Sequence, residues 1–382
     1  MTPMTGFALR LPARIRFGRG AAADAAPEIA AFGRDLLLVH GRDPARAAPL
    51  RAALDGQGCT VAALACPGEP TLPVLLDALD RARALRPRAV VAMGGGAALD
   101  LGKAVAALLP SGGDPLDHLE VVGAGRPLAA PPLPCIAVPT TAGTGSEATK
   151  NAVIGVPERG RKVSLRDDRM VPALAVIDAA LADGTPKAQT LASGLDAVTQ
   201  LVEPYLSARA TPFTDALARP AMAQALRAIV TLMEKGEDAG ARDRLAYAAH
   251  VSGIALANAG LGVVHGLAGP LGGETGAGHG AICARLLPRA LRALDGALPE
   301  AGQARARLSD VVELVDGIVP GGLRGMETWL DGHGLPAAPR LSGATRARVA
   351  AASVASSSMR ASPVRFGEAE LDRMLADMCP EP

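Results

Sequence analysis

The chain is poor in aromatic residues and carries almost no net charge. Phe, Trp and Tyr together make up 2% of its 382 residues, and 39 Lys and Arg balance 38 Asp and Glu to a formal net charge of +1. Stacking of bases needs aromatic side chains, and binding of a phosphate backbone or an anionic lipid surface needs a basic excess. The composition therefore argues against nucleic-acid and membrane-surface partners.

Cysteine is also scarce. The five cysteines are odd in number, are scattered along the chain and never form a C-x-x-C pair. Neither a disulfide framework nor a thiolate metal site is indicated, and we expect reduced thiols in the core.

Long apolar runs are absent as well. No stretch reaches membrane-spanning length, and residues 1–7 lack a basic segment followed by an apolar one. We therefore expect a cytoplasmic protein. With 49% hydrophobic residues, a chain of this length fits two domains, each with its own core.

Short apolar runs alternate with helical patterns in the first half, which is typical of βαβ units and a parallel sheet. We expect strands at residues 36–39, 61–64, 89–91, 136–138 and 174–178, and helices that include 45–57 and 72–85. Beyond about residue 185, helical spacing continues without strand runs, as in residues 189–207, 213–237, 241–260 and 301–318. The chain thus predicts a dinucleotide-binding α/β domain over residues 1–183 and an all-α domain over residues 184–382.

Two strand-turn-helix segments in the first half are suited to bind an anion. One passes through the glycines of 94–103, and the other through the hydroxyls and glycines of 139–147. Glycine allows close approach of the backbone, and the first turn of a helix offers unpaired N–H groups. A tight turn is the alternative interpretation of each alone, but the two together indicate a dinucleotide.

A candidate metal site lies in the second half. Asp196 and Gln200 are four residues apart on an expected helix, and His265 and His279 are flanked by glycines. Asp196, His265 and His279 would form a two-histidine, one-carboxylate site suited to Fe²⁺ or Zn²⁺. A structural role for each histidine is the alternative.

Taken together, these segments resemble the iron-containing (group III) alcohol dehydrogenase family over almost the whole chain. The resemblance rests on residues 17–20, 68–71, 94–103, 139–147, 194–205, 258–265, 279–280 and 286–288. It implies a Rossmann-like N-terminal domain and a helical C-terminal domain related to dehydroquinate synthase, with the active site between them. It also implies a homodimer or a larger homo-oligomer.

The resemblance assigns the cofactor residues. Those expected near the pyrophosphate are Gly94, Gly95, Gly96 and Asp100; those further along the cofactor are Thr140, Thr141, Thr144 and Ser146; those near the nicotinamide are Asn151 and Lys162. For two of these residues, a role without cofactor binding stays open. Lys162 could be a solvated loop lysine, and Asp100 could be an acid favoured at a helix start.

The family's usual metal ligands are one aspartate and three histidines, and this sequence departs from that set. Asp196, His265 and His279 match three of the four positions, whereas Gln200 stands at the fourth. Gly269 stands where a histidine linked to proton relay is common. An amide oxygen is a weaker donor to a transition metal than imidazole, so both the metal and the proton path are affected.

Two mechanisms for hydride transfer between a nicotinamide and a small alcohol or aldehyde are compatible with these residues. In the favoured one, a divalent metal held by Asp196, His265, His279 and Gln200 polarises the substrate oxygen. In the other, similar to the maleylacetate reductases, His265 and His279 stabilise the alkoxide themselves.

The cofactor choice depends on the end of the strand at 36–39. Gly41 and Arg42 follow it, where an acid would bind the adenosine ribose and repel a 2′-phosphate. We therefore expect NADP(H), with NAD(H) tolerated, unless Asp43 makes the selection.

Two other classes remain open at this level. A sugar-phosphate cyclase would use the nicotinamide only transiently, and a nucleotide-binding sensor would have lost turnover. Net consumption of cofactor with a simple aldehyde excludes the cyclase, and cofactor binding without turnover favours the sensor.

Overall fold

The computed structural model describes residues 6–382, which form two compact units. The α/β unit comprises residues 12–185, and the helical unit comprises residues 186–382 together with residues 6–11. The expected boundary at 183/184 lies close to this division, but the start of the chain differs from the expectation. Arg10 explains the difference, because its N–H donates to Asn258 Oδ1 (2.7 Å) and its carbonyl accepts from Asn258 Nδ2 (2.9 Å). Residues 1–5, on which the expectation of a cytoplasmic location partly rested, lie outside the described residues.

The α/β unit is built on a six-stranded parallel sheet with the order β1-β8-β5-β4-β2-β3. Its strands are β1 (Arg14–Phe17), β2 (Asp35–His40), β3 (Thr60–Ala65), β4 (Ala89–Gly94), β5 (Cys135–Pro139) and β8 (Leu174–Ile177). The five strands expected from the apolar runs are confirmed. The edge strand β1 was not predicted, because all four of its residues are exposed and it shows no apolar run.

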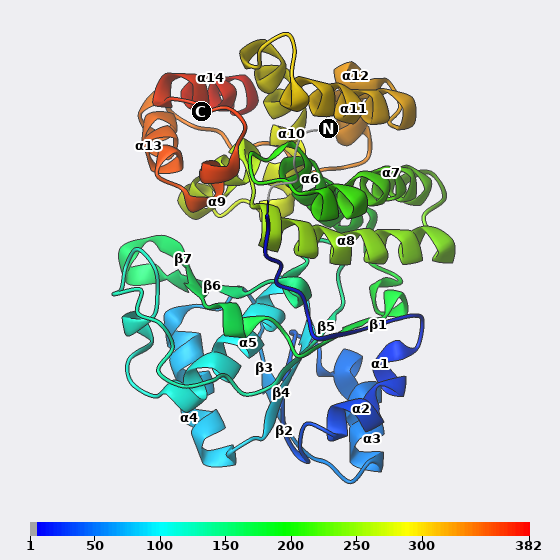
Figure 1. Cartoon of the computed structure of the whole chain (residues 1–382), viewed down its shortest axis with the longest axis vertical. Helices are drawn as coiled ribbons and strands as arrows, with labels where there is room; N and C mark the ends of the chain where they lie inside the picture. The colour runs from blue at the N-terminus through cyan, green and yellow to red at the C-terminus, as the bar shows by residue number, and fades with distance from the viewer. Residues whose placement is uncertain (1–5) are drawn as a thin grey trace. The chain divides into compact units, whose positions relative to one another are not determined.

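Helices cover both faces of this sheet, which is why its inner strands are apolar on both sides. Alternate residues of β4 enter different cores: Val90 and Ala92 pack with α4 (Leu72–Leu85) and α5 (Gly96–Ser111), whereas Val91 and Met93 pack with α1, α2 and α3. The two groups of helices lie on opposite sides of the strands (Figure 1). The helices of the second group are α1 (Ala21–Asp24), α2 (Ala26–Ala30) and α3 (Ala48–Gly56).

The strand order places a topological switch point between β2 and β4. The chain leaves β2 towards β3 through α3, and it leaves β4 in the opposite direction towards β5 through α5, on the other face. In open α/β sheets, ligands bind beyond the carboxyl ends of strands at such a point. The segments that follow β2 and β4 are therefore the expected ligand-binding edge.

A two-stranded antiparallel hairpin, β6 (Asn151–Val156) and β7 (Arg161–Arg166), was not predicted. Its buried residues, including Ile154 and Leu165, join the core that contains α4 and α5. Strand β7 has only two buried positions, Val163 and Leu165, among polar residues, whereas β6 contains a short apolar run at 152–156 that the sequence pattern had not singled out as a strand.

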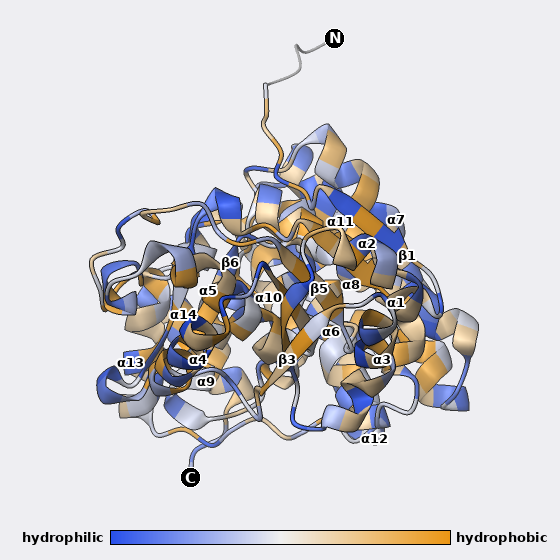
Figure 2. Cartoon of the chain, turned by 90° about the horizontal axis from the view of Figure 1, so that it is seen from below, coloured by the Kyte–Doolittle hydropathy of each residue, from blue (hydrophilic) through white to orange (hydrophobic). Residues whose placement is uncertain are grey.

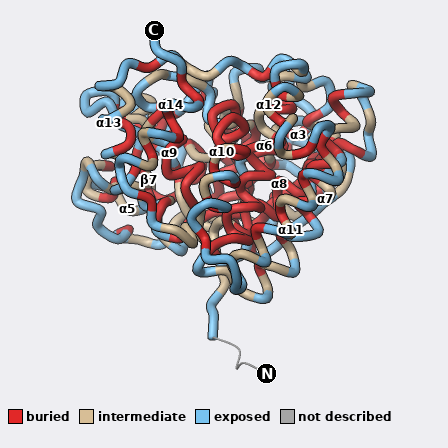
Figure 3. Tube along the Cα trace, turned by 90° about the horizontal axis from the view of Figure 1, so that it is seen from above, coloured by how far each residue is buried: buried red, intermediate tan, exposed pale blue. Residues whose placement is uncertain are grey.

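The helical unit contains no strand among its described residues, as expected. Its helices are α6 (Lys187–Leu206), α7 (Pro212–Lys235), α8 (Ala239–Ala259), α9 (Val263–Thr275), α10 (His279–Ala297), α11 (Gln303–Ile318), α12 (Gly322–Gly332), α13 (Gly343–Val354) and α14 (Glu368–Met378). Buried stretches run along α6 and α10 (Figure 3), and polar and apolar residues alternate along helices such as α7 (Figure 2).

Within residues 6–382, no single helix is long and apolar enough to cross a membrane. Helices α8 and α9 meet that criterion only as a pair, by length and composition, and they are bent by 101° at their junction.

Candidate metal and cofactor sites

The two predicted anion-binding turns of the α/β unit contact each other. Strands β4 and β5 are neighbours in register, and Thr140 N–H donates to Gly94 O (2.9 Å). A Cβ on Gly96 would lie 2.8 Å from Thr144 Cγ2, and one on Gly95 would lie 3.5 Å from the Thr141 side chain. The lack of a side chain at Gly96 therefore allows the α5 turn to approach Thr144 this closely, whereas the Gly95 distance is an ordinary contact. The structure therefore brings Gly94, Gly95, Gly96, Thr140, Thr141 and Thr144 to one edge of the sheet.

Helix α5 begins at this edge without a side-chain cap. Its N-cap residue is Gly95, which has no side chain to accept a hydrogen bond from the first turn, and the first turn contains no acidic residue. The first turn of a 16-residue helix thus presents backbone donors and a partial positive charge that neither a side-chain cap nor an acidic residue in that turn offsets. This cradle fits the pyrophosphate of a dinucleotide.

Asp100 and Ser146 belong to a buried ionic network behind the turns. Ser146 Oγ donates to Asp100 Oδ1 (2.6 Å), and Val153 N–H donates to Asp100 Oδ2 (3.0 Å). Lys103, whose side chain is completely buried, lies 3.3 Å from Asp100 Oδ1 and donates to the carbonyls of Ser146 and Asn151. Both oxygens of Asp100 are thus engaged within the protein, and this network joins the start of α5 to the β5 turn and the hairpin.

The segment after β2 lies at the switch point, as the predicted roles of Gly41 and Arg42 require. Gly41 N–H donates to Met93 O at the end of β4, and a Cβ on Gly94 would lie 3.4 Å from Gly41 N. The Arg42 guanidinium donates through Nε and Nη2 to Pro67 O at 3.2 and 3.0 Å. These hydrogen bonds to Pro67 O hold the Arg42 side chain at the same edge of the sheet as the glycine turn.

Lys162 lies on β7, where its Nζ is 2.5 Å from Glu69 Oε2. Its side chain is 34% exposed, so this pair is partly solvated. The predicted role near the nicotinamide stays a prediction.

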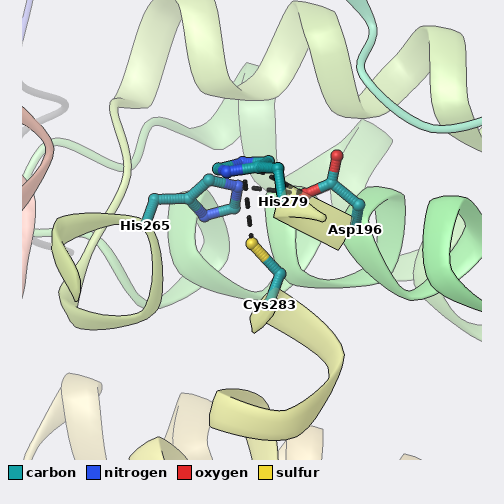
Figure 4. A group of neighbouring side chains, drawn as sticks. All are labelled: Asp196, His265, His279 and Cys283. Atoms are coloured by element: carbon teal, nitrogen blue, oxygen red, sulfur yellow. Dashed lines mark hydrogen bonds and ion pairs between the residues drawn. The ribbon is translucent and has the colours of Figure 1, made fainter. Parts of the chain in front are cut away.

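In the helical unit, four side chains from three helices converge on one point. Asp196 comes from α6, His265 from α9, and His279 and Cys283 from the first two turns of α10 (Figure 4). One ligand atom of each lies within 4.8 Å of those of the others. His265 Nε2 is 3.3 Å from Asp196 Oδ1, His279 Nε2 is 3.7 Å from the same oxygen, and Cys283 Sγ is 3.6 Å from His279 Nε2.

Two atoms of this cluster are buried without a hydrogen bond among the described residues. They are Asp196 Oδ1 and His265 Nε2, on side chains that are 3% and 5% exposed. An unsatisfied buried carboxylate oxygen or ring nitrogen is costly unless a ligand completes it. The cluster therefore fits a divalent metal ion.

Glu203 fixes the orientation of His265. Its Oε2 is 2.6 Å from His265 Nδ1, and its Oε1 accepts from Val264 N–H at 2.6 Å. A proton on Nδ1 leaves the Nε2 lone pair directed at Asp196, which is the tautomer that a metal ligand requires.

Gln200 is engaged on both ends of its amide. Its Nε2 donates to Asp196 Oδ2 (3.0 Å), and its Oε1 accepts from Ser252 Oγ (2.9 Å). Turning the amide around would place its oxygen against the Asp196 carboxylate. Gln200 thus orients Asp196, and its predicted role as a metal ligand stays untested.

The charges of the cluster shift its titration in the absence of metal. Cys283 and Asp196 raise the pKa of His279 to about 9, against the opposing effect of burial. Burial would lower the pKa of His265, but Cys283, Glu203 and Asp196 raise it well above the ordinary value. Burial would raise the pKa of Asp196, but the two histidines hold it below its usual value.

Three residues that contribute to these two sites were not assigned a role from the sequence: Lys103, Glu203 and Cys283. All five cysteines are free and buried, as expected, but Cys283 belongs to a candidate metal cluster, contrary to the expectation of no thiolate metal site. The spacing in the sequence could have indicated two of them, because Cys283 follows His279 by four residues and Glu203 follows Asp196 by seven, on one face of a helix in each case.

Gly269, at the position linked to proton relay, is exposed on α9 and has open space around it.

Comparisons with known proteins match both units of the chain to one family. The family described as "Iron-containing alcohol dehydrogenase" matches residues 12–179, and "Fe-containing alcohol dehydrogenase family, C-terminal" matches residues 190–328. Alcohol dehydrogenase 4 of Schizosaccharomyces pombe is 34% identical over 309 residues, which are 80% of this chain and 71% of that protein.

Two further similarities concern a bacterial relative and a solved structure. The probable alcohol dehydrogenase EutG of Salmonella typhimurium is 38% identical over 242 residues, 63% of this chain, and the alignment spans only 60% of that protein's own length. The crystal structure of a 1,3-propanediol oxidoreductase superposes with a TM-score of 0.86 at 25% identity, covering 98% of this chain and 100% of the other.

Proposed function

The chain belongs to the iron-containing alcohol dehydrogenase family, and from this premise we propose that it is an NAD(P)-dependent oxidoreductase acting on CH–OH groups. It would transfer a hydride between the nicotinamide and the carbonyl carbon of a small alcohol/aldehyde pair, with a proton exchanged at the oxygen. The observation that carries this proposal is the cluster of Asp196, His265, His279 and Cys283, in which two buried ligand atoms lack a hydrogen bond.

In this proposal, Asp196, His265 and His279 hold a divalent metal such as Fe²⁺ or Zn²⁺. The metal would supply positive charge to the substrate oxygen. Glu203 keeps the His265 ring in its ligating orientation, and Gln200 does the same for the Asp196 carboxylate. His279, whose side chain is 43% exposed, lines the solvent-accessible side of the cluster, where a substrate can enter.

The α/β unit would bind the dinucleotide. The uncapped first turn of α5 receives the pyrophosphate, and the Thr140, Thr141 and Thr144 turn lines the cofactor beyond it. NADP(H) is favoured over NAD(H), because Arg42 stands at the switch point and offers a cation to a 2′-phosphate.

A second candidate is a metal-independent reductase of the maleylacetate type. One observation favours it: without metal, the pKa of His279 is raised to about 9 and that of His265 is raised well above its usual value. His279 would then be cationic at neutral pH and could stabilise a developing alkoxide directly, with His265 beside it.

One experiment separates the two candidates. Purified protein is assayed for consumption of NADPH and NADH with short aldehydes and with maleylacetate, before and after removal of metal by a chelator, and after re-addition of Fe²⁺ or Zn²⁺. Activity lost on chelation and restored by metal supports the dehydrogenase. Full activity after chelation, with bound metal verified as absent, overturns the metal-dependent proposal in favour of the second candidate.

We also propose a homodimer or larger homo-oligomer in the cytoplasm, which rests on the resemblance and the composition alone. Light scattering of the purified protein tests the assembly.

A further inference from the structure

We propose that Cys283 Sγ is the fourth protein ligand of the metal, in the role that a third histidine has in the family's usual set. This inference rests on the metal-binding part of the proposed function. It assigns to Gln200 a positioning role next to Asp196 instead of a place among the ligands.

The first argument is the geometry of the cluster. A tetrahedral site with metal–N and metal–O bonds of about 2.0–2.1 Å and a metal–S bond of about 2.3 Å has N···O edges of about 3.3–3.4 Å and N···S edges of about 3.6 Å. The two N···O distances to Asp196 Oδ1, from His265 and His279, are 3.3 and 3.7 Å, and the distance from Cys283 Sγ to His279 Nε2 is 3.6 Å. These three distances are close to the edges of a tetrahedral coordination shell, and all four ligand atoms lie within 4.8 Å of one another.

The second argument is how α10 delivers the sulfur. His279 and Cys283 are one helical turn apart and point to the same side of α10, as Figure 4 shows. Gly280, between them, lies so close to α6 that a Cβ there would be 2.6 Å from Ala192 O. This close approach of the two helices places Cys283, which is 0% exposed, beside Asp196.

The third argument is that both ends of the Gln200 amide already form hydrogen bonds. Its amide nitrogen is bound to Asp196 and its amide oxygen to Ser252, both in fully buried surroundings. To act as a ligand, Gln200 would have to break both hydrogen bonds and leave Asp196 Oδ2 without its donor. Cys283 needs no such rearrangement, because its Sγ already points into the cluster (Figure 4).

Coordination by Cys283 changes the charge of the site. The thiol proton leaves to solvent when the sulfur binds, so one thiolate and one carboxylate together neutralise a divalent ion. A set of one carboxylate and neutral donors would leave a net charge of +1. The Cys283 site should therefore hold its metal firmly. A substrate oxygen would have to enter as a fifth ligand, and the less positive site would polarise it less strongly than an all-nitrogen and oxygen set.

X-ray absorption of the zinc-loaded wild-type protein tests the proposal without any variant. We expect one sulfur scatterer at about 2.3 Å together with nitrogen or oxygen scatterers at about 2.0–2.1 Å. Cobalt-loaded protein should show a thiolate-to-metal charge-transfer band in the near ultraviolet. A shell of nitrogen and oxygen only, with stoichiometric zinc bound, overturns the assignment of Cys283 and leaves the proposed function intact. Absence of zinc binding overturns the metal-binding part of the proposed function, and the assignment falls with it.

Three variants complete the test. Cys283→Ala should abolish the charge-transfer band and weaken zinc binding at least about 100-fold, more than loss of an outer hydrogen bond does. Cys379→Ser, a change at another buried free cysteine of the helical unit, should leave both readouts unchanged. Gln200→Ala should keep the band, because the sulfur stays in place, with zinc affinity reduced about 10- to 100-fold. A band that persists in Cys283→Ala, or disappears in Gln200→Ala with zinc still bound, contradicts the proposal.

Discussion

Glu203 Oε2 lies 2.6 Å from His265 Nδ1, and this contact leaves His265 Nε2 facing Asp196 Oδ1 at 3.3 Å. A carboxylate on α6 therefore determines which nitrogen of a histidine on α9 is available as a ligand. The other Glu203 oxygen accepts from Val264 N–H, so the carboxylate bridges the backbone and the ring of adjacent residues.

Glu203→Gln should weaken zinc binding about 10- to 100-fold. The amide has one acceptor oxygen, so its NH₂ group must face either Val264 N–H or His265 Nδ1–H, and one donor loses its partner. Zinc competition against a coloured chelator measures the effect. Glu234→Gln, on the exposed face of α7, makes the same charge change and serves as the control. Equal zinc affinity in both variants would contradict a role for Glu203.

Gly280→Ala should separate α10 from α6 and weaken zinc binding at least about tenfold. The added methyl group would lie 2.6 Å from Ala192 O and 2.9 Å from Ala192 C, and backbone cannot move aside as a flexible side chain can. Overpacking of this kind costs about 1–3 kcal/mol of unfolding free energy. Denaturant unfolding and zinc competition are the measurements.

Gly278→Ala is the matched control, because nothing lies within 4 Å of its added Cβ and its φ of −62° suits any residue. It should stay within about 1 kcal/mol of wild type. Similar losses at both glycines would show that the close approach to Ala192 is unimportant.

Lys103→Met should destabilise the α/β unit by about 3–5 kcal/mol. The change removes the cation from a fully buried side chain, leaves the Asp100 carboxylate uncompensated, and deprives the Ser146 and Asn151 carbonyls of a donor. Urea unfolding of both proteins gives the difference. Lys150→Met, which breaks the partly exposed pair with Asp168, should cost about 1 kcal/mol or less. A loss at Lys103 no greater than at Lys150 would exclude a structural role for the buried network.

Arg42→Ala should raise the KM for NADPH about 10- to 100-fold and leave that for NADH within about twofold. A charge-assisted hydrogen bond to a 2′-phosphate contributes about 1.5–3 kcal/mol, and NADH has no such phosphate. Steady-state kinetics with both cofactors measure the ratio, and Arg51→Ala, on the exposed surface of α3, is the control. An equal effect on both cofactors would reject Arg42 as the selecting residue.

Tyr205 should ionise far above the ordinary phenol range. Burial and the hydrogen bond that its hydroxyl donates to Asp310 Oδ2 (2.7 Å) raise its pKa from 10 to about 12. The pKa of Tyr205 is higher in the folded state than in the unfolded state. Its contribution to the free energy of unfolding is therefore complete below pH 10 and is lost as the pH rises towards 12.

The chain contains two tyrosines, so a Tyr247→Phe variant lets the phenolate absorbance report Tyr205 alone. Asp310→Asn should lower the midpoint, and circular dichroism shows whether the fold persists through the titration. Ionisation of Tyr205 near pH 10 in a folded protein would contradict the contact with Asp310.

The local pattern of residues was sufficient to predict most of the secondary structure of the chain. Apolar runs such as 36–39 and 89–91 correspond to the buried strands β2 and β4, and the helix expected at 72–85 is α4. These features are readable because strand and helix periodicities involve neighbouring residues only. The edge strand β1 escaped detection because its four exposed residues show no apolar run. Strand β7 has only two buried positions, and the short apolar run within β6 was not assigned to a strand from the sequence.

The sequence likewise predicts Asp196, His265 and His279 as candidate metal ligands, since residue type alone identifies a possible ligand. Which other side chains join them was decided by the packing of α6, α9 and α10. Gln200 and Cys283 each lie four residues from a candidate ligand, so spacing could not distinguish them. The tertiary structure turns the Gln200 amide towards Ser252 and brings Cys283 Sγ into the cluster, because Gly280 lets the backbones of two helices approach closely. The residue types can be read from the sequence alone. The choice between Gln200 and Cys283 depends on contacts between segments that are far apart in the sequence.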